Sequence, residues 1–269
     1  MQNKTNKKKP VEIVQKPIVS GSWHGKDAWK LAFKRALVMF AIVAVYLISG
    51  IMFAFDSLWA RILTCALVVA ITAYYLYAGG VAQGQTDAAF GEILYSRRED
   101  GHEITAADSE RSFQPFKGLF AVLIGSIPFV LFTLVFAFLT EKTSYTLGTL
   151  PGWMDSLTAQ TEVGDALGYY HVQRSMGVVE IMRVIDRAMI MPFINVASYF
   201  GAEACLLAER LSPLLILIAP MGYALGYSQG LRFRTRINTG IKMGDDKKKR
   251  KERKARKQRQ RSKAPERLI

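Results

Sequence analysis

Four long apolar runs constrain the fold of this chain more than any other feature. They cover residues 36–55, 60–80, 118–140 and 211–233, and each contains few or no charged side chains. About 20 helical residues, at a rise of 1.5 Å each, cross a hydrocarbon core of about 30 Å. Because the backbone polar groups of a spanning segment must bond to one another, a helix is the form expected for each run. The sequence therefore predicts an all-α integral membrane protein with four transmembrane helices.

The distribution of charge predicts that both termini are cytoplasmic. Residues 1–35 contain nine Lys or Arg against two Asp or Glu, and residues 231–269 contain seventeen against four. The residues between these two segments have the opposite balance, with ten against sixteen. Cytoplasmic flanks of membrane helices are enriched in Lys and Arg. The membrane domain, 36–233, is therefore expected to contain two hairpins, with a cytoplasmic loop at 81–117 between them and an external segment at 141–210 within the second.

Residues 177–207 of the external segment are predicted to form a helical hairpin that does not cross the membrane. Charged residues recur there at helical spacing: Glu180, Arg183, Asp186 and Arg187. This pattern predicts an amphipathic helix with ion pairs along one face. A solvated face is the simpler interpretation, and a clamp for an anion or a lipid headgroup is the alternative. Pro192 is expected to break the helix. A fifth crossing, by 188–207, would place one basic terminus outside, so an interfacial or re-entrant hairpin is favoured.

A short repeat links the second and fourth apolar runs. Residues 78–84 and 224–230 both match A-x-G-x-x-Q-G, at the predicted cytoplasmic end of each helix. The match is either a coincidence among glycine-rich helix ends or a pair of small-residue contact faces. A third interpretation is a transporter site between the hairpins, although no Asp, Glu or Lys lies in the middle of a span. The residues expected at the helix contact are Gly80, Gln83, Gly84, Gly222, Gly226, Gln229 and Gly230.

No pattern in the chain predicts a reaction. His24, His102 and His171 are far apart and lack a second ligand at helical spacing. Cys65 lies within an apolar run, and Cys205 lies near a predicted membrane edge, so a metal site or a disulfide framework is not expected. Phosphate-binding loops and nucleophile motifs are absent from the sequence. We therefore expect a protein that is not an enzyme, with no catalytic residue, cofactor or metal.

The two basic ends, 1–35 and 234–269, are predicted to be mostly disordered. From Lys242 onward the tail contains fourteen Lys or Arg and no aromatic residue, so it cannot stack on bases. Phosphates are its natural partners, either as anionic lipid headgroups or as ribosomal RNA. A topology anchor without a dedicated partner is the simpler alternative. The expected phosphate contacts are Lys247, Lys248, Lys249, Arg250, Lys251, Arg253, Lys254, Arg256, Lys257, Arg259, Arg261 and Lys263.

Together these features predict a multi-pass protein of interaction or scaffolding type. Its partners are expected to be the lipid bilayer, a phosphate surface at the tail, and another membrane protein or a second copy of the chain. A small permease or transporter subunit is the alternative. The charge pattern is typical of a bacterial plasma membrane protein with both termini in the cytoplasm.

Overall fold

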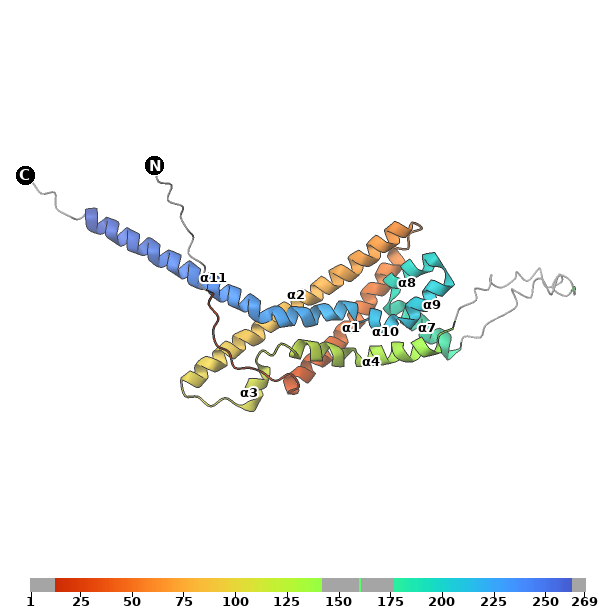
Figure 1. Ribbon diagram of the computed structural model, residues 1–269, viewed down its shortest axis with the longest axis horizontal. Coiled ribbons are helices and arrows are strands. Elements are labelled where there is room, and N and C mark those ends of the chain that lie inside the picture. The colour runs from red at the N-terminus through yellow and green to blue at the C-terminus, as the bar shows by residue number, and fades with distance from the viewer. Residues whose placement is uncertain (1–12, 142–159, 161–176, 263–269) are drawn as a thin grey trace, which may run out of the picture. The chain divides into compact units, whose positions relative to one another are not determined.

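The regular elements in the described part of the chain are all helices. The computed structural model describes residues 13–141, 160 and 177–262 (Figure 1). The helices are α1 Lys26–Met52, α2 Leu58–Glu99, α3 Ala106–Arg111, α4 Lys117–Leu139, α7 Val178–Met189, α8 Met191–Ala197, η2 Ser198–Phe200, α9 Ala202–Arg210, α10 Ser212–Leu215 and α11 Ile218–Ser262. Four segments are long and apolar enough to cross a membrane: α1, α2, α4 and the stretch Ser212–Arg259. The predicted all-helical fold with four such helices is confirmed.

The chain folds into two compact units. Unit 1 contains the described residues of 1–29, 77–120 and 224–269, and unit 2 contains those of 30–76 and 121–223. The four long helices each contribute residues to both units, whereas α3 belongs to unit 1 and the helices from α7 to α10 belong to unit 2.

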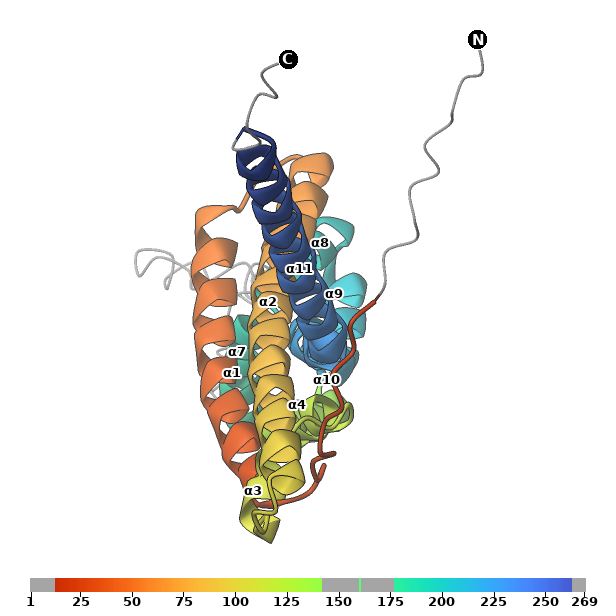
Figure 2. The same ribbon diagram turned by 90° about the vertical axis from the view of Figure 1, so that its left-hand side faces the viewer.

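In unit 1, residues 13–25 form a non-helical segment that lies across several helices. The Val14 amide donates to Thr239 Oγ1 of α11 at 3.0 Å. The Val19 amide donates to the Gly91 carbonyl of α2 at 3.2 Å, and the Gly21 amide donates to the Phe113 carbonyl at 3.0 Å. In both views this segment, in dark red, runs from beside α11 to α3 (Figures 1 and 2). These bonds order a stretch of the N-terminus that the sequence predicts to be mostly disordered.

In unit 2, aromatic and small residues pack α1 against α4. The rings of Phe40 and Phe129 lie 5.0 Å apart, edge to face. A side chain at Gly125 would lie 2.6 Å from the Ala32 carbonyl oxygen, so the two backbones approach too closely for any larger residue. Further along α1, the Gly50 carbonyl accepts a hydrogen bond of 2.8 Å from Asn195 of α8. The last of these contacts holds α8 against the end of α1.

Three helices are longer than the sequence predicts. α1 begins at Lys26 rather than at residue 36, and Asp27 in its first turn interacts favourably with the helix dipole. α2 continues to Glu99, through much of the predicted 81–117 loop. It ends where Gly101 takes a φ of 84° and its amide bonds back to the Arg98 carbonyl. The glycines at 79, 80 and 84 do not end α2, and Gly84 lies against Tyr227 and Gly230 of α11.

The basic tail is also helical, whereas the sequence predicts disorder for 234–269. α11 runs without a break from Ile218 to Ser262. Between Gly244 and Ser262 the sequence has no Gly or Pro and is rich in Lys, Arg, Gln, Glu and Ala, which are good helix formers. Acidic residues precede arginines by four positions at Asp246–Arg250 and Glu252–Arg256, which favours a helix. Local propensity therefore outweighs the repulsion between like charges.

Residues 177–210 form helices that are interrupted at Ile190 and at Gly201, whereas the sequence predicts an interruption at Pro192. α7 ends at Met189, Ile190 separates it from α8, and Pro192 lies in the first turn of α8, where a proline is well tolerated. The second break is at Gly201, whose φ of 96° favours glycine. Whether this segment is interfacial or re-entrant, and whether the long helices pair as hairpins, stay predictions. A helix that the sequence predicts to start at Pro151 lies outside the described residues.

Candidate functional sites

The basic part of α11 exposes charge on all sides. Its lysines and arginines from Lys247 to Arg259 are exposed, together with Asp245, Asp246 and Glu252. The helix contains only three acidic residues from Lys242 to Arg259, so the local charge is strongly positive. Of the expected phosphate contacts, Lys263 and the side chain of Arg261 lie outside what the structure describes. Gly244, Lys247, Lys248, Arg250 and Lys251 line an open hollow on this strongly positive surface.

The repeated glycines bring α2 and α11 into backbone contact. A side chain at Gly84 would lie 2.5 Å from the Tyr227 carbonyl oxygen and 3.0 Å from Gly230 Cα. A side chain at Gly226 would collide with the Tyr77 carbonyl, and one at Gly222 would lie 2.5 Å from the Ala73 carbonyl oxygen. Gly80 is buried on α2. The glycine-rich stretches of α2 and α11 therefore meet directly, and their contact leaves no room for a ligand at these positions.

The two glutamines of the repeat do not make the hydrogen bonds that the sequence predicts across this contact. Gln83 Nε2 donates to Asp87 Oδ1 on its own helix, at 2.8 Å. Gln229 Oε1 accepts from Arg232, also on its own helix, at 3.4 Å. Glycines allow the backbones to approach so closely that the polar side chains are directed along each helix instead.

An ion cluster around the buried Lys117 in unit 1 joins residues from five helices, and we call it the Lys117 cluster. Lys117, at the start of α4, has no exposed side-chain surface; its Nζ lies 2.8 Å from Asp27 Oδ2 and 3.4 Å from Asp87 Oδ2. Lys117 also donates to the carbonyls of Glu110 and Arg111. The Tyr227 hydroxyl of α11 donates to Asp87 at 2.6 Å. Because every member is paired, the cluster stabilises the packing of these helices.

A second buried cluster, in unit 2, is centred on Glu209 of α9, and we call it the Glu209 cluster. Arg187 Nη2 and Nε lie 2.6 and 2.7 Å from Glu209 Oε1. Arg183 Nε lies 3.5 Å from Glu209 Oε2, and the Thr140 hydroxyl donates to the same oxygen at 2.6 Å. Arg183 Nη1 also lies 3.8 Å from Glu180. Glu209 is 1 % exposed; of the charged residues of α7, Arg183 and Asp186 are buried, whereas Glu180 and Arg187 are half-buried, so the predicted solvated face is wrong.

Asp186 belongs to the same buried region but has a different environment. Its side chain is 0 % exposed, and neither carboxylate oxygen has a hydrogen-bond partner in the part of the chain that the structure describes. Burial raises the pKa of Asp186 to about 7; Ser212 and Arg187 oppose this shift, and Glu209 adds to it. Asp186 therefore changes its charge near neutral pH, which is unusual for an aspartate.

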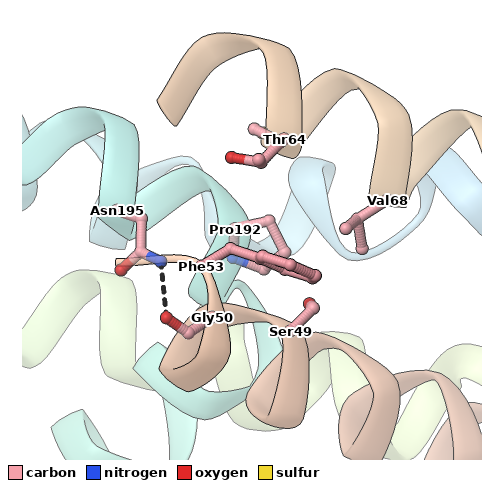
Figure 3. A pocket seen from close by; sticks show the side chains of 8 residues that line it. Ser49, Gly50, Phe53, Thr64, Val68, Pro192 and Asn195 are labelled. Atoms are coloured by element: carbon pink, nitrogen blue, oxygen red, sulfur yellow. Dashed lines mark hydrogen bonds between the residues drawn. The ribbon is translucent and has the colours of Figure 1, made fainter. Parts of the chain in front are cut away.

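A cavity of about 10 Å³ lies between α1, α2 and α8 in unit 2. Figure 3 shows Ser49, Gly50 and Phe53 from α1 and the residue after its end, Thr64 and Val68 from α2, and Pro192 and Asn195 from α8. A volume of this size holds about one water molecule. The hydroxyls of Ser49 and Thr64 bond to carbonyls of their own helices, and Cys65 also lines the cavity.

The described residues also contain no group of side chains arranged to hold a metal ion and no disulfide. Among the described residues, no three His, Cys, Asp or Glu side chains are close enough to hold a metal ion. Cys65 and Cys205 are unbonded to each other, and burial raises the pKa of the Cys205 thiol, which keeps it protonated.

Comparison with models of known protein families, with curated proteins and with solved structures gives no match. The function must therefore be argued from the residues themselves. The two buried ion clusters are the features that sequence reasoning missed. Their only signal was the spacing of charged residues at the ends of apolar runs, which a solvated surface also produces.

Proposed function

We propose that this chain is a non-enzymatic multi-pass membrane protein whose basic C-terminal helix binds phosphates of RNA, such as those on a ribosome. The proposal places the protein in a bacterial plasma membrane with both termini in the cytoplasm, in agreement with the positive charge at both ends. One observation favours RNA over lipid: α11 is a single helix from its apolar start at Ile218 to Ser262.

The length of this helix separates its charges from a bilayer. From Phe233, where the apolar stretch ends, to Arg259 an α-helix extends about 39 Å. Transmembrane helices tilt by about 0–40° from the bilayer normal, so most of this length projects away from the headgroups. Charges are screened beyond about 8 Å at physiological salt. Anionic lipid is therefore within reach of only the first cations, such as Arg232 and Arg236.

The composition of the exposed helix favours contacts that do not depend on base sequence. It has no aromatic residue after Lys242, and its cations occupy every side of the helix. Lys and Arg that contact phosphates position a protein on RNA without reading the bases. A membrane protein that holds ribosomes or other RNA near the bilayer by charge alone would act as a scaffold.

The contact between α2 and α11 supports a scaffold rather than a transporter. A permease with a site between the two glycine-rich helix ends would need a cavity there. Gly84 and Gly230 instead bring the α2 and α11 backbones into direct contact. The same contact supports a structural role for the A-x-G-x-x-Q-G repeat.

Co-sedimentation tests the proposal with the full-length protein and a version truncated after Gly244. Each protein is mixed with ribosomes and, separately, with liposomes of anionic lipid across a salt series. We expect the full-length protein to bind ribosomes near physiological salt and the truncated one to lose that binding. Tail-dependent binding to liposomes without binding to ribosomes would overturn the proposal and make the tail a lipid anchor.

Charge variants of the helix give a matched control for the truncation. Replacing Lys247, Lys248 and Lys249 by Gln keeps good helix formers and removes three cations. If the helix binds RNA phosphates, the slope of log K against log salt should become shallower by about 2. Replacing Asp245 and Asp246 by Asn should strengthen binding instead. If the Lys→Gln variant and the Asp→Asn variant bound ribosomes equally well, contact through phosphates would be contradicted.

A further inference from the structure

We infer that Asp186 is a buried proton-binding site, which holds a proton while α7, α9 and α10 are packed together and releases it when their packing loosens. This inference is independent of the proposed RNA binding, because it concerns unit 2 and not the basic helix. The arguments are the charge balance of the Glu209 cluster, the closure of the site and the position of Ser212.

Among the described residues, the arginines of the cluster pair with glutamates rather than with Asp186. Arg187 binds Glu209 through two nitrogens, at 2.6 and 2.7 Å. Arg183 lies between Glu209 and Glu180, at 3.5 and 3.8 Å. Two arginines are thus balanced by two glutamates. An ionised Asp186 would give this buried region an excess negative charge, whereas a protonated one leaves it neutral.

The site is closed to ligands larger than a proton. Both Asp186 oxygens and Ser212 Oγ have almost no accessible surface, and Asp186 and Ser212 are each 0 % exposed. Two nearby arginines also disfavour a metal cation at the same oxygens. A proton adds no volume and removes the charge, so it is the ligand that this geometry accepts.

Ser212, at the start of α10, is the neighbour that most directly opposes protonation. A hydroxyl close to a carboxylate stabilises the charged form, and Ser212 lowers the pKa of Asp186 in this way, although its Oγ lies outside hydrogen-bond geometry with both carboxylate oxygens. The charged and titratable groups around Asp186 come from each neighbouring element: Glu180, Arg183 and Arg187 of α7, Cys205 and Glu209 of α9, and Glu141 after α4. α8, which also contacts α7, has no titratable side chain.

Release of the proton would be coupled to the external helices. With Asp186 ionised, the negative charges of Asp186 and Glu209 repel each other, and the packing of α7 against α9 weakens. Cys205, one turn before Glu209 on α9, is buried and is a natural reporter of this change. The segment would therefore respond to pH on its own side of the membrane.

The test uses the full-length protein in detergent and follows the midpoint of thermal unfolding from pH 5.5 to 8.5. The variants are Asp186→Asn, which cannot bind the proton, and Arg210→Gln, which removes an exposed charge from the end of α9. We expect the midpoint of the wild type and of Arg210→Gln to fall as the pH rises. The midpoint of Asp186→Asn should be nearly independent of pH. An Asp186→Asn protein with the wild-type slope would overturn the inference.

A second variant decides the question if Asp186→Asn does not fold. Ser212→Ala retains the carboxyl and removes the hydroxyl that favours its charged form. The pH at which the midpoint falls should then rise by about one unit or less. In a Cys65→Ser background, the pH at which maleimide modification of Cys205 accelerates should rise by the same amount when Ser212 is replaced by Ala. An unchanged pH dependence in both measurements would contradict proton binding at Asp186.

Discussion

Glu209 Oε1 accepts both Nη2 and Nε of Arg187, at 2.6 and 2.7 Å, while the Glu209 side chain is 1 % exposed. This relationship joins α7 to α9 inside unit 2. A charge-assisted bond of this kind is strong because both partners are ionised and water is excluded. It also uses the cation that Asp186 would otherwise have.

Replacing Glu209 by Gln should destabilise the protein strongly. The change leaves the buried Arg183 and the half-buried Arg187 without this anion, at a cost of about 3 kcal/mol. Thermal or denaturant unfolding in detergent measures this loss. Arg210→Gln, at an exposed position next to it, should change stability by less than about 0.5 kcal/mol. Similar losses in the two variants would mean that Glu209 is not the centre of a buried network.

The stability of the wild type should fall with rising pH because of Asp186. Its pKa is raised from 3.8 to about 7 in the folded protein, so the folded state binds more protons than the unfolded state between these values. The contribution is fully present below pH 4, and it is lost as the pH rises toward 7. Between pH 5 and 7 the loss relative to Asp186→Asn should be about 2 kcal/mol. A wild type that becomes more stable than Asp186→Asn over this range would show the opposite sign.

Replacing Lys117 by Met should destabilise unit 1 while preserving the size of the side chain. Asp27 and Asp87 would lose the ammonium that pairs with them, at a cost of about 3 kcal/mol. Combining Lys117→Met with Asp87→Asn should recover part of this loss, because one of the two unpaired charges is then removed. Unfolding of the single and double variants measures the recovery, and its absence would contradict the pairing.

Substitutions of two glycines on α2 should distinguish the effect of helix contact with α11 from the effect of helix propensity. Gly84→Leu forces a side chain into the Tyr227 and Gly230 backbone and should cost about 2 kcal/mol or more. Gly79→Ala, five positions earlier on the same helix, meets nothing within 4 Å and should stabilise the helix by up to about 1 kcal/mol. Equal effects in unfolding experiments would mean that α2 and α11 are not in contact at Gly84.

A proline in the basic helix should change its preferred partner. Met243→Pro keeps every charge of the tail but breaks α11 before the basic stretch, which allows that stretch to turn toward the bilayer. Binding to anionic liposomes should increase in the co-sedimentation assay, because more cations come within the screening length. Met243→Ala is the matched control and should bind like the wild type. Equal liposome binding by the two variants would show that the direction of α11 does not limit lipid contact.

The apolar runs were sufficient to predict four membrane-spanning helices, because hydrophobic length alone decides which segments can cross a bilayer. The ends of these helices were not predictable in the same way. Residues 85–99 read as a polar loop, yet they continue α2, since Asp87 and Glu92 find partners on α4 and α11. Helix propensity decided the tail, where a charge-based argument predicted disorder.

The sequence by itself determined where the apolar helices lie and that the positive charge is concentrated at the two ends. Both follow from properties that each residue has alone. Only the tertiary structure decided which charges are buried. Glu180, Arg183, Asp186 and Arg187 have the spacing of a solvated helix face, and Glu209 on another helix makes that face part of a buried network. Pairing between segments distant in sequence sets the charge state of Asp186, and such pairing leaves no pattern in a single sequence.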